Sequence, residues 1–317
     1  MGTVRDMVVH ERGTHDERVA VRIHPGRVVG FDEFRASHPA AALALDGYVE
    51  GPSRWDWDGP WGTLDHHAGV ERLRTGASCE QTAAAVRLGL WDRLGPDRSL
   101  DVHLNDCDAD TCLSVWLLRH PGRATEAPVE ALVRWEGRLD ARGGCALGLV
   151  PEAYLRYLAW VFEPYVAWRH DARADVGAAA QADVIDRVGE RIDAWADGDA
   201  EELDVDSGYE VLRRTEHAVA VAERGPHARL AIQADGRSCY VAVRDHGGRT
   251  VMTVDRVDDE VPLDLLDVWD DLNELEGRGP DHDDRWGGGD LIGGSPRRSG
   301  TTLTVERVCD VVERRFR

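Results

Sequence analysis

Two short clusters of carboxylates and imidazoles in the sequence have the residue types and spacing to do chemistry. The first is Asp65-His66-His67, and the second is the run Asp106-Cys107-Asp108-Ala109-Asp110. Crowded carboxylates repel one another unless protons or cations intervene. Hard carboxylate oxygens with one or two imidazoles favour Mn²⁺ or Mg²⁺ over Zn²⁺. The two clusters therefore predict a divalent-metal site.

Each cluster follows a run that is typical of a β-strand. Residues 61–64 precede the first cluster, residues 100–104 precede the second, and a third apolar run, 40–49, contains Asp46 near its end. In an open α/β sheet, ligands bind beyond the carboxyl ends of the strands. We therefore expect all three segments to place their polar side chains at one edge of a sheet.

Hydrophobic periodicity and turn residues divide the rest of the chain. We expect helices at 78–94, 110–119, 151–169, 178–196, 208–224 and 262–276, and a last helix after Thr304. Ser78 is the expected N-cap of the first of these helices. We expect strands at 18–23, 27–31, 228–234, 238–244 and 250–254. Residues 129–139 fit a strand or a short helix. The fold class is α/β: an N-terminal α/β domain with a mainly parallel sheet (1–196), a linker (197–206) and a smaller C-terminal α+β domain (207–317).

Composition limits the function classes. The chain has 317 residues and a formal net charge of -21, and lysine is absent. Such a surface repels long nucleic acids, although a small phosphorylated partner can bind where arginine is concentrated. Because no signal sequence or long apolar run is evident, we expect a cytoplasmic protein that makes no membrane contact. The six cysteines form no CxxC pair, which predicts reduced thiols. The oligomeric state stays open, with a homodimer as one option.

Asp65-His66-His67 at a strand end, followed by a capped helix, resembles the signature of the DHH phosphoesterase superfamily. Its members are two-domain, manganese-dependent hydrolases. The family's other prominent motif is His-x-Asp-x-Asp-Gly-x-x-Ser, which the run from Asp106 to Ser114 matches with Asp106 in place of the histidine and Thr111 in place of the glycine. The order of the two motifs is reversed relative to the family. Either the motifs are permuted, or the second cluster is an expanded form of the family's late single-aspartate motif.

The resemblance implies a site for two ions, Mn²⁺ or alternatively Mg²⁺. It implies that Asp65 orients a ligating imidazole and that His67 faces the substrate phosphate. The candidate metal ligands are Asp46, His66, Asp106, Asp108 and Asp110, with Asp140 as a further candidate. His103, His120 and His170 are expected to be ordinary surface or capping residues.

A glycine-rich loop at 286–300 resembles a divergent substrate-binding loop of DHH-associated domains, without the family's Gly-Gly-His. Backbone N–H groups that no side chain obstructs can cradle a phosphate, and arginine can add a bidentate contact. The candidate substrate-binding residues are Gly288, Gly293, Gly294, Ser295, Arg297 and Arg298.

These features predict hydrolysis of a phosphoester or phosphoanhydride in a nucleotide, a short oligonucleotide or a phosphorylated metabolite. One alternative is a haloacid-dehalogenase-like phosphatase that uses Asp108 as nucleophile with Mg²⁺. Another is a non-catalytic nucleotide- or partner-binding protein with an eroded DHH domain. A calcium loop that opens at Asp106 is a third, although Leu117 occupies its last ligand position.

Overall fold

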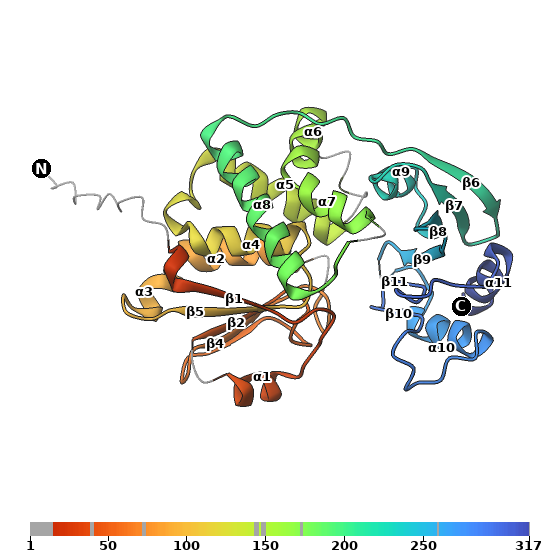
Figure 1. Cartoon of the computed structure of the whole chain (residues 1–317), viewed down its shortest axis with the longest axis horizontal. Coiled ribbons are helices and arrows are strands. Elements are labelled where there is room, and N and C mark those ends of the chain that lie inside the picture. The colour runs from red at the N-terminus through yellow and green to blue at the C-terminus, as the bar shows by residue number, and fades with distance from the viewer. Residues whose placement is uncertain are drawn as a thin grey trace, which may run out of the picture. The chain divides into compact units, whose positions relative to one another are not determined.

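The computed structural model of the chain describes residues 15–38, 41–71, 74–142, 146, 150–171, 174–258 and 260–316. The chain divides into two compact units. Unit 1 comprises Met1–Ala141, Trp160–Tyr165 and Asp175–Glu201, and unit 2 comprises Arg142–Ala159, Val166–Ala174 and Glu202–Arg317. The fold is mixed α/β, as predicted, and each unit has its own sheet (Figure 1). Within the described ranges, no helix has the length and apolar character needed to cross a membrane.

The sheet of unit 1 has the strand order β1-β5-β2-β4-β3. Four neighbours run parallel, namely β1 (Val19–Ile23), β5 (Leu100–Leu104), β2 (Ala42–Leu45) and β4 (Trp61–Leu64), whereas the edge strand β3 (Arg54–Asp56) is antiparallel to β4. Every residue of β2 is buried, which is typical of a central parallel strand covered on both faces. The carboxyl ends of β5, β2 and β4 therefore lie side by side.

Helices cover both faces of this sheet (Figure 1). The helices α2 (Ser78–Arg87) and α4 (Ala109–Arg119) pack together on one face, and α8 (Ala178–Asp197) packs against α4 and β1. On the other face, α1 (Phe31–Ser37) contributes Phe34 to a cluster with Ala42 and Ala44. The remaining elements are η1 (Asp16–Arg18), α3 (Leu90–Leu94), η2 (Pro121–Arg123), α5 (Ala127–Arg142), α6 (Glu152–Val161) and α7 (Glu163–His170).

The sheet of unit 2 has the order β10-β11-β9-β8-β7-β6. The strands are β6 (Tyr209–Arg214), β7 (Val219–Glu223), β8 (Cys239–Asp245), β9 (Thr250–Arg256), β10 (Gly287–Gly288) and β11 (Ile292–Gly294). Only β7 and β8 are parallel neighbours, joined through α9 (Ala228–Ala234), and the other pairs in this sheet are antiparallel.

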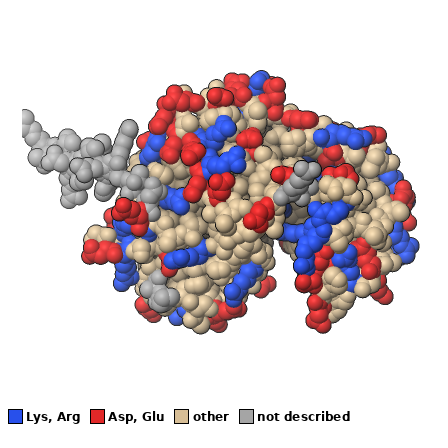
Figure 2. Space-filling view, viewed as in Figure 1, with Lys and Arg blue, Asp and Glu red and all other residues tan. Residues whose placement is uncertain are grey.

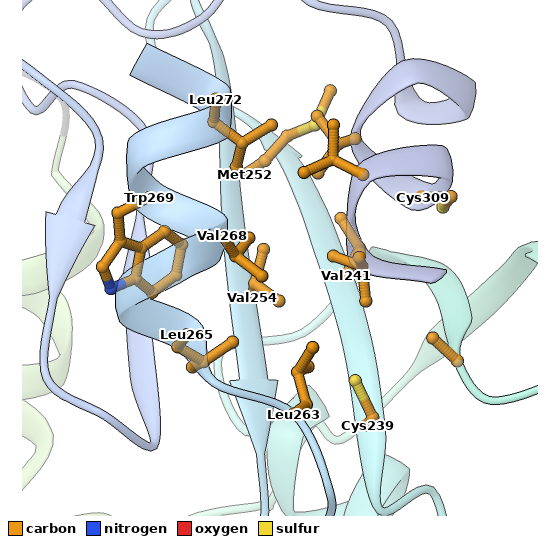
Figure 3. Close-up of a cluster of buried hydrophobic side chains, with 14 of the residues drawn as sticks. Cys239, Val241, Met252, Val254, Leu263, Leu265, Val268, Trp269, Leu272 and Cys309 are labelled. Carbon is orange, nitrogen blue, oxygen red and sulfur yellow. The ribbon is translucent and has the colours of Figure 1, made fainter. Parts of the chain in front are cut away.

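The core of unit 2 lies on the opposite face of that sheet from α9. Side chains of α10 (Leu265–Leu275) and α11 (Val305–Arg315) meet those of β8 and β9 there, as Figure 3 shows for Val268, Val241 and Val254. The α9 face has its own smaller cluster around Ile232 and Tyr240. Both faces of the sheet are therefore covered. This packing holds in place the strands that carry the charged residues described below.

Several predicted elements are corrected by the structure. The predicted strand 27–31 is wrong because only Val29 forms a bridge and α1 begins at Phe31. The predicted helix 208–224 is the pair β6 and β7, whose alternating exposure in β6 has the period of a strand. The predicted strand 228–234 is α9, residues 129–139 belong to α5, and 151–169 is split into α6 and α7.

The predicted helix 78–94 also differs. It is divided at Gly89, whose φ of +83° lies in the left-handed region, into α2 and α3. Ala77 is the N-cap, and the backbone N–H of Ala77 donates to the Glu80 carboxylate at 3.2 Å. Ser78 is thus the first helical residue, which leaves its hydroxyl group available for contacts with the candidate site.

Candidate metal centre

The three predicted segments converge at the carboxyl edge of the sheet of unit 1. Asp46 follows β2, the Asp65-His66-His67 cluster follows β4, and Asn105 after β5 donates from Nδ2 to the carbonyl oxygen of Gly47 at 3.0 Å. Asp46 has a φ of +47°, in the left-handed region that non-glycine residues adopt uncommonly. Its backbone N–H is held by the carbonyl oxygen of Leu64 at 3.0 Å.

Two groups of candidate ligand atoms share the imidazole of His66. In the first group, Oδ1 of Asp46 lies 3.4 Å from Nε2 of His66 and 3.5 Å from Nδ1 of His67. In the second, Nε2 of His66 lies 2.8 Å from Oδ2 of Asp140, with Asp110 as the third member. Within each group the ligand atoms lie within 4.8 Å of one another.

Hydrogen bonds from α2 hold two of these carboxylates. The oxygens of Asp110 accept from the backbone N–H groups of Ser78 and Cys79, each at 2.7 Å. The hydroxyl of Ser78 donates to Oδ1 of Asp46 at 3.1 Å. Because the first N–H groups of a helix have no intrahelical partner, α2 binds Asp110 at its N-terminus.

Asp65 is almost completely buried and fixes the conformation of the histidine pair. Its Oδ1 accepts from the backbone N–H groups of His66 at 2.8 Å and His67 at 3.1 Å, and it lies 2.8 Å from Nδ1 of His67. The side chain of His67 is 45% exposed, whereas that of His66 is 3% exposed. Asp65 therefore orients His67, and the imidazole of His67 reaches the surface.

The carboxylates of the second sequence cluster point to different partners. Asp108 is the N-cap of α4, where its Oδ1 accepts from the N–H of Thr111 at 2.8 Å, and it also hydrogen-bonds with Asp46. Asp106 accepts from the N–H of Cys107 at 2.8 Å and lies outside both ligand groups, as Asp108 does. The calcium-loop alternative is therefore wrong, since its carboxylates must converge on one ion.

The charges of the site are strongly coupled. Burial opposes ionisation of Asp46, but the neighbouring His67 and His66 outweigh it and hold the pKa of Asp46 below its ordinary value. For His66, burial lowers the pKa, while Asp140 and Asp46 raise it to about 11. Burial together with Asp140 and Asp46 raises the pKa of Asp110 to about 8. Burial and Asp46 likewise raise the pKa of Asp108 well above its usual range.

The side chains fit a divalent cation. Nε2 of His66 is buried and lies 2.8 Å from Oδ2 of Asp140 and 3.4 Å from Oδ1 of Asp46, and Oδ2 of Asp65 is buried without a hydrogen-bond partner among the described residues. Buried polar atoms without partners cost free energy that a bound cation would recover. Carboxylates whose raised pKa values reflect mutual repulsion are also those that a cation stabilises most.

The sequence patterns did not reveal Glu136, which lies one helical turn before Asp140 on α5. Glu136 is 8% exposed, and burial together with Asp140 and Asp110 raises its pKa well above the usual range. The spacing of four residues between Glu136 and Asp140 was the signal present in the sequence. It could not be recognised because residues 129–139 fitted a strand as well as a helix. His103 was misplaced too, since it is 2% exposed. The imidazole of His120, which stacks on Trp116, is partly exposed.

The glycine-rich loop lies in unit 2, where its residues have structural contacts. A Cβ atom on Gly293 would lie 2.5 Å from the carbonyl oxygen of Gly287, and one on Gly288 or Gly294 would also meet backbone atoms closely. Ser295 is buried, and its hydroxyl accepts from the N–H of Met252 at 3.1 Å. Arg298 forms an ion pair with Asp283 at 2.7 Å, and Arg297 is exposed. A substrate-binding role for this loop stays a prediction.

Comparison with known proteins shows distant similarity among solved structures only. No family model and no curated protein matches the chain. Among solved structures, the chain is similar to a phosphodiesterase. That protein is PggH from Vibrio cholerae, described as pGpG-specific, with 10% sequence identity and a TM-score of 0.33 over 87% of this chain and 97% of that chain. A similarity at this level defines neither the fold nor the activity of this chain.

Proposed function

We propose that the protein is a divalent-metal-dependent phosphoesterase of DHH type. Its substrate is a small phosphorylated molecule, such as a nucleotide, a short oligonucleotide or a phosphorylated metabolite. The observation that carries the proposal is the buried imidazole of His66, whose Nε2 lies within 3.4 Å of carboxylate oxygens of both Asp46 and Asp140. The Asp-His-His motif and three neighbouring strand ends support it.

The proposed ligands form two sets around His66. Asp46 lies on one side, and Asp110 and Asp140 lie on the other. Oxygen-rich sites with one imidazole suit Mn²⁺ or Mg²⁺. Such ions, when bound, supply an activated water and neutralise the charge of the phosphoryl group. Asp108 and Asp106 are proposed to act near these ligands, Asp108 through its hydrogen bond to Asp46.

His67 is proposed to face the substrate phosphate. Its Nδ1 is held by Asp65, so the opposite edge of the half-exposed ring is the one that can reach a ligand. Burial lowers the pKa of His67, but Asp46 and Asp65 outweigh it and raise the pKa. The imidazolium form is therefore favoured, and a cationic donor stabilises the charge that develops on a phosphoryl oxygen.

The phosphatase alternative, in which Asp108 is the nucleophile, gains no specific support. One oxygen of Asp108 caps α4, where it accepts from the backbone N–H of Thr111. An aspartyl-phosphate intermediate trapped on Asp108 would restore that alternative.

A phosphate-release screen tests the proposal. The full chain is assayed with Mn²⁺, Mg²⁺ or a chelator on nucleotides, dinucleotides, pyrophosphate and a chromogenic phosphodiester. We expect hydrolysis that the chelator abolishes and Mn²⁺ restores, and loss of activity in His66→Ala. The matched control is His282→Ala, which changes an exposed histidine of unit 2 and should leave the rate unchanged. Tight metal binding without hydrolysis of any substrate class would instead indicate a non-catalytic binding protein.

A further inference from the structure

Basic side chains gather in one place in unit 2 of a chain whose net charge is -21. Figure 2 shows acidic and basic side chains scattered over the visible surface, with patches of arginine that include one on unit 2. One basic cluster comprises Arg229 on α9, Arg244 on β8 and His170 at the end of α7. A local concentration of cations within a strongly acidic protein needs a physical reason.

Strand register places two of these residues on one face of the sheet. Tyr240, Ala242 and Arg244 alternate along β8, so Arg244 shares the face that α9 covers through Tyr240 and Ala242. The parallel partner β7 ends at Glu223, beside the position where β8 reaches Arg244. Arg244 therefore lies at the carboxyl end of the only parallel strand pair described in unit 2, which is the end where α/β sheets bind ligands.

A side-chain contact joins Arg244 and His170, and Arg229 lies on α9, the helix that covers the same face of the sheet. Nη1 of Arg244 donates to Nδ1 of His170 at 3.5 Å. Arg229 donates from Nη2 to the hydroxyl of Thr253 at 3.3 Å and pairs with Glu223 at 3.4 Å. The side chain of Arg229 is 41% exposed and His170 is exposed, so a ligand from solution can reach both.

The electrostatic environment of the basic cluster is positive. Burial lowers the pKa of His170, and Arg244, Arg229 and Arg169 lower it further, to about 4. The acidic groups that face the cluster are Glu223 and Asp255 beside Arg229, Asp171 near His246, and Asp206 near His227. At His170 itself the strongest charged neighbours are all cationic, so an anion placed there would be stabilised.

The glycine-rich loop of the same unit is a weaker candidate for an anion site. Its backbone N–H groups at Arg298 and Ser299 each donate to the carboxylate of Asp284 at 3.0 Å. The chain thus fills that position with a carboxylate of its own. Around His170, by contrast, the strongest charged neighbours are arginines.

We propose that Arg244, Arg229 and His170 form a binding site for the phosphate group of a small phosphorylated molecule. The guanidinium groups supply planar pairs of donors that match phosphate oxygens, and the imidazole adds a further donor when protonated. The inference rests on the proposed function only for the class of molecule, a small phosphorylated compound.

Direct titration tests the site separately from catalysis. Inorganic pyrophosphate is titrated into the full-length chain by calorimetry, without added metal, so that binding does not depend on the metal centre. We expect Arg244→Gln to weaken binding by about tenfold or more, because a charge-assisted hydrogen bond is lost. Arg244→Lys should recover part of the affinity, since it keeps the charge without the planar fork. The NMR-detected pKa of His170 should rise when pyrophosphate binds.

The matched control is Arg307→Gln, which changes an exposed arginine of α11 in the same unit and should bind pyrophosphate as the wild type does. Equal binding by Arg244→Gln and wild type, or an equal loss in Arg307→Gln, overturns the inference. If Arg244→Gln is unfolded by circular dichroism, the exposed substitution His170→Gln decides in its place, with a several-fold loss expected and wild-type affinity overturning it. Chelator-sensitive hydrolysis by the wild type, together with unchanged pyrophosphate binding by Arg244→Gln, would overturn this site while leaving the proposed function intact.

Discussion

Nε2 of His66 lies 2.8 Å from Oδ2 of Asp140, which joins the end of β4 to the last turns of α5. The same nitrogen lies 3.4 Å from Oδ1 of Asp46. A helix and a strand end that meet through an imidazole and two carboxylates are positioned for a shared ion. The contact also identifies which carboxylates of the sequence clusters are expected to matter most.

Asp140→Asn should lower the affinity for Mn²⁺ much more than Asp106→Asn. Asp140 belongs to a group of ligand atoms around His66, whereas the carboxylate of Asp106 accepts from the N–H of Cys107 outside both groups. We expect a loss of about tenfold to a hundredfold for Asp140→Asn and a few-fold loss for Asp106→Asn, measured by calorimetric titration. The reverse ranking would place Asp106, the residue in the position of the family's motif histidine, at the metal.

Gly293→Ala should destabilise unit 2. Its Cβ would lie 2.5 Å from both the Gly287 carbonyl oxygen and the Trp269 ring, and overpacking of this kind costs about 1 to 3 kcal/mol. Gly287→Ala is the control, because a Cβ there meets no atom within 4 Å. Thermal unfolding of the two variants checks this. Equal melting temperatures would mean that the glycines of the loop are needed for some purpose other than packing.

The protein should lose stability in mild acid through three stacked histidines of unit 1. Nε2 of His24 lies 3.1 Å from Nδ1 of His103, and the ring centroids of His38 and His103 are 3.8 Å apart. Burial, with His38 and His24 nearby, lowers the pKa of His103 from 6.5 to about 3. The unfolded chain therefore takes up protons that the folded chain refuses as the pH falls below 6.5. Stability should fall by up to about 1.4 kcal/mol per pH unit until the folded pKa is reached.

Urea unfolding of the wild type and His103→Phe between pH 7.5 and 4.5 measures this effect. The aromatic replacement keeps a ring beside Tyr48 and removes the titration, so its stability should depend less on pH over that range. His282→Asn, at an exposed position, should follow the wild-type profile. Parallel profiles for wild type and His103→Phe would show that His103 makes no contribution to the acid lability.

The convergence of the site was predictable from the sequence because the end of each parallel strand can be recognised from a short stretch of residues. The runs 61–64 and 100–104 are strands as predicted, and Asp46, Asp65 and His66 lie beyond the ends of neighbouring strands. Each assignment needed only an apolar run followed by a polar residue. Strand order was not predictable from these patterns, since it depends on which strands pair across the sheet.

Other features depend on tertiary contacts that no local pattern encodes. Asp110 binds the N-terminus of α2, and Glu136 faces Asp110 from α5, so both relationships require the packing of separate helices. The strand and helix assignments in 208–234 were wrong because short apolar runs fit either period. The cluster at Arg244 was missed because its members come from α7, α9 and β8, far apart in the sequence.

The number of Mn²⁺ ions bound by the full chain and by His66→Ala tests the central claim most directly. Metal analysis after equilibration with Mn²⁺ and removal of free ions gives this number, with circular dichroism to confirm that the variant is folded. Because Nε2 of His66 lies beside carboxylates of both groups of ligand atoms, we predict two ions in the wild type and loss of at least one, with loss of phosphoester hydrolysis, in His66→Ala. A wild-type chain that binds no Mn²⁺, or a variant that keeps both ions, would contradict the account.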